Sequence, residues 1–198
     1  MIALLNKRCL LLIIVTMGFT LLSCTRHSPS LDASLHVAAC VGDITKTRMV
    51  LWGGANINAT DSRGYSALMD AEACTTRPGR PELMELLIAK GAAVNLQARN
   101  GRTALMYAAK NGDTRAVKAL LKGGASVNIA DNEGETALME AVTFSCDANT
   151  IRALVDAGAD LKATNHKGES PQTSICLMSG LGGIVSADTR NLAKSSKK

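Results

Sequence analysis

The sequence is poor in the residues that most often carry catalysis. Its 3 histidines are His27, His36 and His166, and none lies beside a serine or cysteine in a nucleophile arrangement. There is no Gly-Lys loop to cradle a phosphate, and no C-x-x-C or H-x-x-x-H pair has the spacing of a zinc site. We therefore expect no enzymatic activity, no metal, no cofactor and no small-molecule substrate.

A long hydrophobic run is also missing. The apolar segment from Cys9 to Leu22 has 14 residues, fewer than the roughly 20 that a membrane-spanning helix needs. Lys7 and Arg8 precede it, and a charged start before a short apolar core predicts a secretory signal peptide. The Leu-Leu-Ser-Cys junction that ends at Cys24 resembles the lipobox of bacterial lipoproteins. That resemblance implies acylation of Cys24, and ordinary secretion is the alternative.

The lipoprotein resemblance also implies a location. Thr25 follows the cysteine, in place of the aspartate that resembles an inner-membrane retention signal. We expect a lipid-anchored protein of the outer membrane that faces the periplasm, with residues 1–23 removed and residues 24–30 as a linker. Removal of the signal takes away Lys7 and Arg8 and lowers the formal net charge from +5 to +3. The mild charge and the envelope location argue against a nucleic-acid partner.

Two glycine series indicate an internal repeat. A Gly-Ala pair recurs with spacings of 37, 33 and 34 residues, and a second glycine series has the same spacings. The pairs begin at Gly54, Gly91, Gly124 and Gly158, and the second series is Gly64, Gly101, Gly134 and Gly168. Because the two series stay in step, the sequence is organised in units of 33 to 37 residues.

Each unit has the pattern of two short helices. In the third unit, Leu105, Ala108 and Ala109 lie on one face at helical spacing. A Gly-Asp pair then interrupts the pattern, and a second apolar face begins at Val117. Gly124 follows it, where a left-handed C-terminal cap favours glycine. The pattern predicts an all-α protein.

The motifs of the third unit resemble the ankyrin repeat. Residues 102–109 read Arg-Thr-Ala-Leu-Met-Tyr-Ala-Ala, and residues 124–128 read Gly-Ala-Ser-Val-Asn. The resemblance implies an all-α solenoid of about four to five helix-turn-helix repeats with β-hairpin-like finger turns. Met69, Met106 and Met139 stand where the family usually has a histidine that bridges neighbouring repeats, so apolar packing must replace those hydrogen bonds.

The repeat domain is expected over residues 31–178. Its units are placed at 31–60, 61–97, 98–130 and 131–164, with a degenerate cap at 165–178 and a cap remainder with a flexible tail at 179–198. The first unit keeps the helix motif of residues 35–39 but lacks a finger glycine before it, which fits an N-terminal cap.

The second unit departs from the pattern twice. Residues 75–81 make it four residues longer between its helices, and this insertion is either a binding loop or a tolerated surface insertion. Glu72 stands where the other units have Ala39, Ala109 and Val142. Either the helix is rotated locally, or a carboxylate lies partly buried.

Four cysteines follow Cys24. In the ankyrin arrangement, Cys40 and Cys74 lie in adjacent units, as do Cys146 and Cys176, so each pair could form a disulfide. Small free cysteines packed in helices are the alternative. Cys74 and Cys146 are two units apart, which is too far for a bridge.

The family's variable positions imply a partner-binding surface on the finger turns and first helices. Carried over, they are Arg63, Tyr65, Arg99, Asn100, Arg102, Tyr107, Lys110, Asn111, Asn132, Glu133, Glu135, Phe144, His166 and Lys167. Tyrosine and arginine are frequent interface anchors. Since the chain has only 2 Tyr, 2 Phe and 1 Trp, the placement of Tyr65, Tyr107 and Phe144 on one predicted surface indicates binding. The alternative is that Tyr107 and Phe144 simply cover the neighbouring helices.

Three functions are compatible with such a surface. The favoured hypothesis is an immunity protein that occludes a periplasm-acting toxin, because lipid-anchored ankyrin proteins are similar to those paired with phospholipase effectors of type VI secretion. The second is an accessory protein that docks a resident envelope enzyme, for example in oxidative-stress defence. The third, an enzyme that uses its cysteines, would require a thiol of low pKa.

Overall fold

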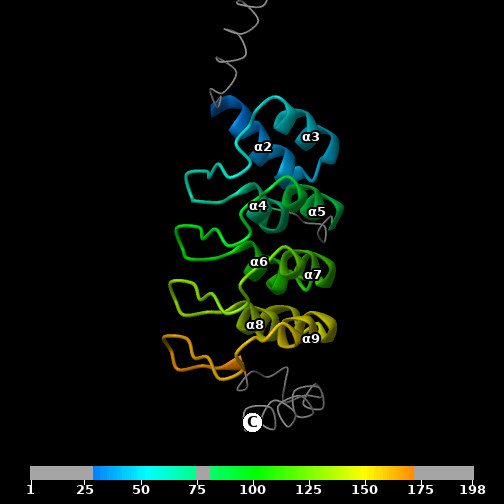
Figure 1. Ribbon diagram of the computed structural model, residues 1–198. Coiled ribbons are helices and arrows are strands. Elements are labelled where there is room, and N and C mark those ends of the chain that lie inside the picture. Colours follow the sequence, from blue (N-terminus) through cyan, green and yellow to red (C-terminus); the bar gives the residue numbers. More distant parts are fainter. Residues whose placement is uncertain (1–28, 75–80, 172–198) are drawn as a thin grey trace, which may run out of the picture.

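The computed structural model describes residues 29–74 and 81–171, which form a single stack of helix pairs (Figure 1). Each pair has a first helix next to the finger turns and a second helix on the far side. The first helices are α2 (Pro29–Val41), α4 (Ala67–Ala73), α6 (Ala104–Asn111) and α8 (Ala137–Glu140), which continues as the π-helix η1 (Ala141–Ser145). The second helices are α3 (Ile44–Trp52), α5 (Pro81–Ala89), α7 (Thr114–Lys122) and α9 (Ala148–Asp156).

Three of the second helices begin at an aspartate cap. The carboxylates of Asp43, Asp113 and Asp147 accept hydrogen bonds from backbone N–H groups in the first turns of α3, α7 and α9. Such a side chain satisfies a donor that the helix itself leaves without a partner. The local sequence therefore sets where these helices start.

The finger turns, at residues 53–66, 90–103, 123–136 and 157–170, are tied together by their backbones. The N–H groups of Arg99, Asn132 and His166 each donate to a carbonyl oxygen of the preceding finger, at 3.0, 3.1 and 2.9 Å. Glycine is required at this close approach. At Gly101, with φ +79°, an added Cβ would lie 2.6 Å from the backbone nitrogen of Asn132. The finger glycines thus set the spacing between repeats.

Stacking buries one face of every helix. Leu68, Leu105 and Leu138 of the first helices are each 1% exposed, and the second helices contribute Leu87, Leu120 and Leu154. Met69, Met106 and Met139 are buried as well, which confirms that apolar packing takes the place of the family's bridging histidine. Burial of a side chain of this size contributes about 1.5–3 kcal/mol.

One expected boundary and the expected fold class can be compared with the structure. The predicted linker 24–30 is two residues too long, because α2 already begins at Pro29. The all-α solenoid is confirmed, and two of its fingers close on an isolated β-bridge, Thr60–Ser66 and Ala130–Thr136. The signal peptide, Cys24, most of the insertion (75–80) and the segment 172–198 lie outside the described residues.

None of the helices within residues 29–74 and 81–171 is both long and apolar enough to cross a bilayer.

Candidate functional site

A tyrosine pair lies at the centre of the finger side, between the second and third repeats. The rings of Tyr65 and Tyr107 are tilted, with centroids 5.4 Å apart, and the Tyr107 hydroxyl donates to that of Tyr65 at 2.5 Å. The Asn100 amide donates to the Tyr107 oxygen at 3.4 Å. The guanidinium of Arg63 covers the Tyr65 ring at 4.2 Å. The pair is therefore held in place before any partner arrives.

The two tyrosines differ in accessibility. Tyr107 is 9% exposed, and its burial, with the hydrogen bond to Tyr65, raises its pKa to about 12. Tyr107 therefore keeps its proton, and its hydroxyl donates a hydrogen bond to the Tyr65 oxygen. Within the described residues no acceptor takes the Tyr65 hydroxyl hydrogen, and the Arg63 side chain above it is 56% exposed. This side of the cluster can donate to a partner.

A second cation–aromatic contact lies two repeats along the stack. The Lys110 ammonium lies 4.1 Å from the centre of the Phe144 ring, and Phe144 is 57% exposed. Lys110 also lies 3.9 Å from the carboxylate of Glu140. A large exposed aromatic ring next to a lysine is a surface that a protein partner can cover.

A π-helical turn presents Phe144. Helix α8 widens into η1, and the turn ends at Cys146 in the left-handed region, with φ 51°. The Ser145 hydroxyl ties the turn to the carbonyl oxygen of Ala109 in the preceding repeat, at 3.0 Å. Such one-residue bulges are frequent at functional sites. The sequence does contain the extra residue of this π-helical turn, since Gly134 to Gly158 spans 24 residues where Gly101 to Gly124 spans 23. The glycine spacing alone does not show where in the unit the extra residue lies.

Arg102, expected to contact a partner, is committed inside the protein. Its side chain is 20% exposed, and it donates to Asp131 at 3.1 Å and to the carboxylate of Glu140. Both acids are nearly inaccessible, at 3% and 2% of the side chain. Burial raises the pKa of Glu140, against the opposite effect of Arg102 and Lys110. The arginine thus joins the third repeat to the fourth.

A matching polar contact joins the first repeat to the second. The Nδ1 atom of His36 lies 2.6 Å from the buried carboxylate of Asp70, which raises the pKa of the histidine. Arg63 reaches the same carboxylate at 3.4 Å. His36 therefore joins the first repeat to the second.

Of the two alternatives for Cys40 and Cys74, a disulfide or free thiols, the structure has the second. Both are free thiols, and the Cys74 thiol donates to the carboxylate of Asp70 at 3.8 Å. Burial is the main reason that the pKa of Cys74 rises to about 12, so its thiol is a weak nucleophile and does not support the cysteine-enzyme alternative. Cys146 is disulfide-bonded, but Cys176 lies outside the described residues, and their pairing stays a prediction.

The remaining candidates divide into two groups. Some make internal contacts: Asn111 donates to the carbonyl oxygen of Glu72, Asn132 to that of Arg99, and Glu135 accepts from Asn165. Others are exposed along the successive fingers, namely Arg99, Glu133, His166 and Lys167. Arg63 and Arg99 make the tips of the fingers at 53–66 and 90–103 cationic, and the finger at 123–136 carries the acidic Glu133.

At Glu72 the sequence left two alternatives open, a rotated helix or a partly buried carboxylate. Glu72 is 1% exposed, and neither of its oxygens has a hydrogen-bond partner. Burial, reinforced by Asp113, raises its pKa to about 7. Helix α4 keeps its register, because Leu68 and Met69 are buried like their counterparts. The carboxylate is therefore buried completely and the helix is not rotated.

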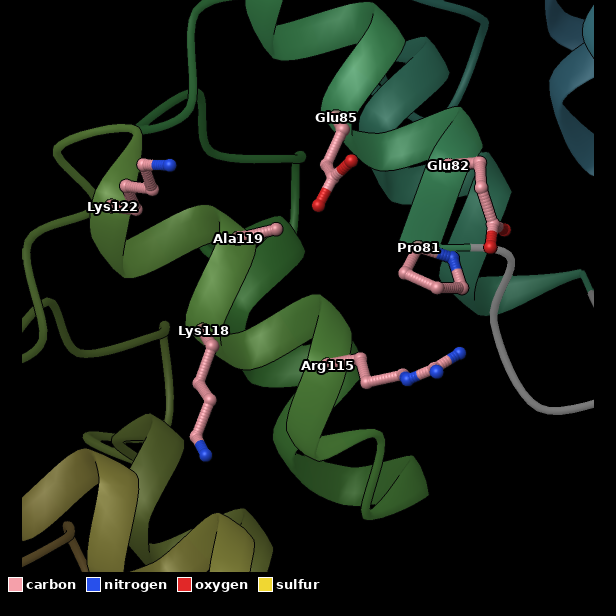
Figure 2. Close-up of a pocket in the computed structure, with 7 residues that line it drawn as sticks. All are labelled: Pro81, Glu82, Glu85, Arg115, Lys118, Ala119 and Lys122. Atoms are coloured by element: carbon pink, nitrogen blue, oxygen red, sulfur yellow. The ribbon is translucent and has the colours of Figure 1, made fainter.

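The far side of the stack carries a shallow groove between α5 and α7 (Figure 2). Glu82 and Glu85 line one wall, with Arg115, Lys118 and Lys122 on the other. Although their charges are opposite, no ion pair within 4.0 Å joins the two walls in the described chain. Nor do residues 29–74 and 81–171 contain a cluster of His, Cys, Asp or Glu that could hold a metal ion.

Comparison with known proteins agrees with the helix-pair stack. Residues 71–165 match a family model described as ankyrin repeats, in 3 copies. The chain is similar to Ankyrin repeat and SOCS box protein 6 of Pongo abelii and of Homo sapiens, with 31% identity over 155 residues in both cases. The matched region is 78% of this chain but only 29% of each relative, so the chain spans less than a third of their length.

Proposed function

Since the described chain is an all-α ankyrin-repeat solenoid, we propose that it is a non-enzymatic binding protein that holds a protein partner on its finger side. The observation that carries this proposal is the fixed aromatic row that runs over three repeats. It consists of the Tyr65–Tyr107 pair under Arg63, followed by Phe144 under Lys110.

This row has the properties of an interface anchor. Tyrosine, arginine and exposed phenylalanine bury large areas when a partner covers them. The hydrogen bonds from Asn100 to Tyr107 and from Tyr107 to Tyr65 already hold the two tyrosine rings in place. Binding then loses little side-chain entropy, which favours affinity. The Arg63 and Phe144 side chains of the row are more than half exposed, which suits a protein better than a small molecule held in a closed pocket.

The partner that we propose is a periplasm-acting antibacterial toxin of the phospholipase type delivered by type VI secretion, which would make this chain an immunity lipoprotein. The support is the lipoprotein-like signal that ends at Cys24 and the absence of catalytic motifs in the sequence. An acylated immunity protein would stand at the membrane where such a toxin acts. Its finger side would cover the mouth of the toxin's active site and keep lipid out.

Affinity capture of the full acylated chain from its host, grown in contact with competitors, tests this proposal. Recovery of one stoichiometric lipase-like toxin, with protection of a sensitive strain that expresses the chain, is expected. Recovery of a resident envelope enzyme instead, with oxidant sensitivity of a deletion strain grown alone, would reject immunity and favour the accessory role.

Two variants locate the surface. Phe144→Ala and Arg99→Glu change exposed side chains, so the fold should tolerate both. Each is expected to weaken capture of the recovered partner about tenfold or more, as for an interface hot spot. Lys118→Ala, in the far-side groove, is the matched control. If Phe144→Ala and Arg99→Glu capture the partner as well as Lys118→Ala and the wild type do, the finger side is not the binding surface.

A further inference from the structure

Four of the five exposed large apolar side chains of the described residues lie on the two helices at one end of the stack. Val37 and Val41 on α2 are 54% and 66% exposed, and Met49 and Trp52 on α3 are 59% and 93% exposed. Phe144 is the fifth such residue and lies three repeats away. Helices α2 and α3 form the end of the stack nearest the N-terminus (Figure 1).

The repeat register explains why these residues are uncovered. Residues of the first repeat correspond to those of the third at an offset of 70, as the helix caps Asp43 and Asp113 show. Val37 and Val41 therefore occupy the positions of Tyr107 and Asn111, which contact Tyr65 and Glu72 of the preceding repeat.

Met49 occupies the position of Ala119, which lines the groove against α5 of the preceding repeat. Among the described residues no repeat precedes α2. Val37, Val41 and Met49, with Trp52 at their edge, form what we call the N-terminal end face.

Beside this face, between α3 of the first repeat and α5 of the second, lies a hollow with two cations that no carboxylate of the described chain neutralises. Arg48 and Lys90 line this hollow together with Leu51, Leu86 and Trp52. Within residues 29–74 and 81–171, neither cation lies within 4.0 Å of a carboxylate.

The acids of the first repeat are used by its own backbone. Asp32 accepts from the N–H of Asn56, and Asp43 caps α3. An exposed tryptophan beside free cations is the combination found at the boundary between an anionic bilayer and water.

The length of chain before α2 adds a second argument. If Cys24 is acylated, only residues 24–28 separate the acyl chains from Pro29. Five residues span at most about 17 Å when fully extended. The N-terminal end face is then the part of the described domain that is held closest to the membrane.

We propose that the N-terminal end face rests on the anionic phospholipid surface to which Cys24 is anchored. Trp52 and Met49 enter the headgroup region, and Arg48 and Lys90 contact lipid phosphates. The stack stands on its end, so the finger side remains open to a partner. This inference rests on the acyl anchor of the proposed function but not on the identity of the toxin.

Trp52 is the only tryptophan of the chain, so its fluorescence reports on this contact directly. The full acylated protein is reconstituted in vesicles of phosphatidylethanolamine and phosphatidylglycerol, with and without bromine-labelled acyl chains. We expect blue-shifted emission, strong quenching by the brominated lipid and weak quenching by aqueous acrylamide. Emission that stays water-like, with full acrylamide quenching, would overturn the proposal.

Variants test whether contact of the end face with lipid is the cause of the Trp52 quenching. Met49→Asp places a charge on the end face and is expected to return Trp52 to water, whereas Lys118→Asp on α7 leaves the lipid quenching unchanged. Loss of the single charge in Arg48→Gln is expected to shift the docked-to-undocked ratio about fivefold. Equal quenching of the wild type in vesicles of neutral phosphatidylcholine would contradict the role of the cations.

Three further outcomes are decisive. Mass spectrometry that finds Cys24 unmodified in the membrane-purified protein removes the tether and overturns the proposal. Shielding of Trp52 only after an acidic protein is added would identify the face as a protein interface instead. Protection from the toxin by Met49→Asp, with lipid quenching lost, shows that the end face and the finger side act separately and supports the assignment.

Discussion

The buried carboxylate of Glu72 makes a quantitative prediction about stability and pH. Its pKa is raised from 4.5 to about 7 in the folded protein, mainly by burial. The folded state therefore binds the proton more tightly than the unfolded state does. Below pH 4.5 the carboxyl is protonated in both states and has no effect. Between pH 4.5 and 7 the carboxyl ionises in the unfolded chain but keeps its proton in the folded one, so stability falls progressively, and above pH 7 the full penalty applies.

The size of the penalty follows from the shift. One pKa unit corresponds to about 1.4 kcal/mol, so this carboxylate destabilises the protein by about 3 kcal/mol at pH 8. That is a large share of the roughly 5–15 kcal/mol by which domains are stable. In Glu72→Gln the side chain has nearly the same shape and no charge, so the penalty is removed at high pH only.

Urea unfolding of the wild type and of Glu72→Gln at pH 4.5 and pH 8 measures this directly. The variant should match the wild type within error at pH 4.5 and exceed it by about 3 kcal/mol at pH 8. Glu85→Gln, which changes an exposed glutamate on α5, serves as the control and should show no such difference. A Glu72→Gln effect of equal size at both pH values would refute the assignment of a buried, unpaired charge.

Further predictions concern the fingers, the buried ion pairs and the thiols. Gly101→Ala meets both a positive φ and a backbone nitrogen 2.6 Å from its Cβ, whereas Gly124→Ala meets only a positive φ with open space. Gly124→Ala should lower the unfolding free energy by about 1–2 kcal/mol and Gly101→Ala by clearly more; equal losses would contradict the close approach. Arg102→Met takes the arginine away from two buried acids, of which Glu140 keeps only Lys110 at 3.9 Å, and should lose about 3–5 kcal/mol in the same assay; additional replacement of Glu140 by Met should recover part of that loss. Cys74, whose pKa is raised to about 12, should react with iodoacetamide at pH 8 far more slowly than in the unfolded chain, as followed by mass spectrometry, and equal rates would contradict its burial.

The charges of the finger side and of the end face have different roles. Arg102 and His36 are paired with buried acids of the next repeat, so they hold the stack together. Arg48 and Lys90 have no such acid within reach in the described chain. Formal charge alone does not distinguish the two groups, and a cation that the structure leaves unpaired is the better candidate for an external partner.

The sequence by itself determined the repeat, the helix pairs and the positions of the fingers. These features depend on residues within one period. Asp113 caps a helix that starts at the next residue, and Gly101 is required by the φ of its own finger. The apolar face of each helix follows from 3.6-residue spacing. For the same reason, the burial of Met69, Met106 and Met139 could be anticipated.

The tertiary structure alone decided the parts that depend on stacking. Arg102 pairs with Asp131 across 29 residues, and Tyr107 reaches Tyr65 across 42. A surface arginine and a buried ion-pair arginine look the same in a single repeat. The complete burial of Glu72 likewise required its neighbours to be in place. Contacts between repeats determine which polar groups remain for a partner, because only stacking removes a side chain from water.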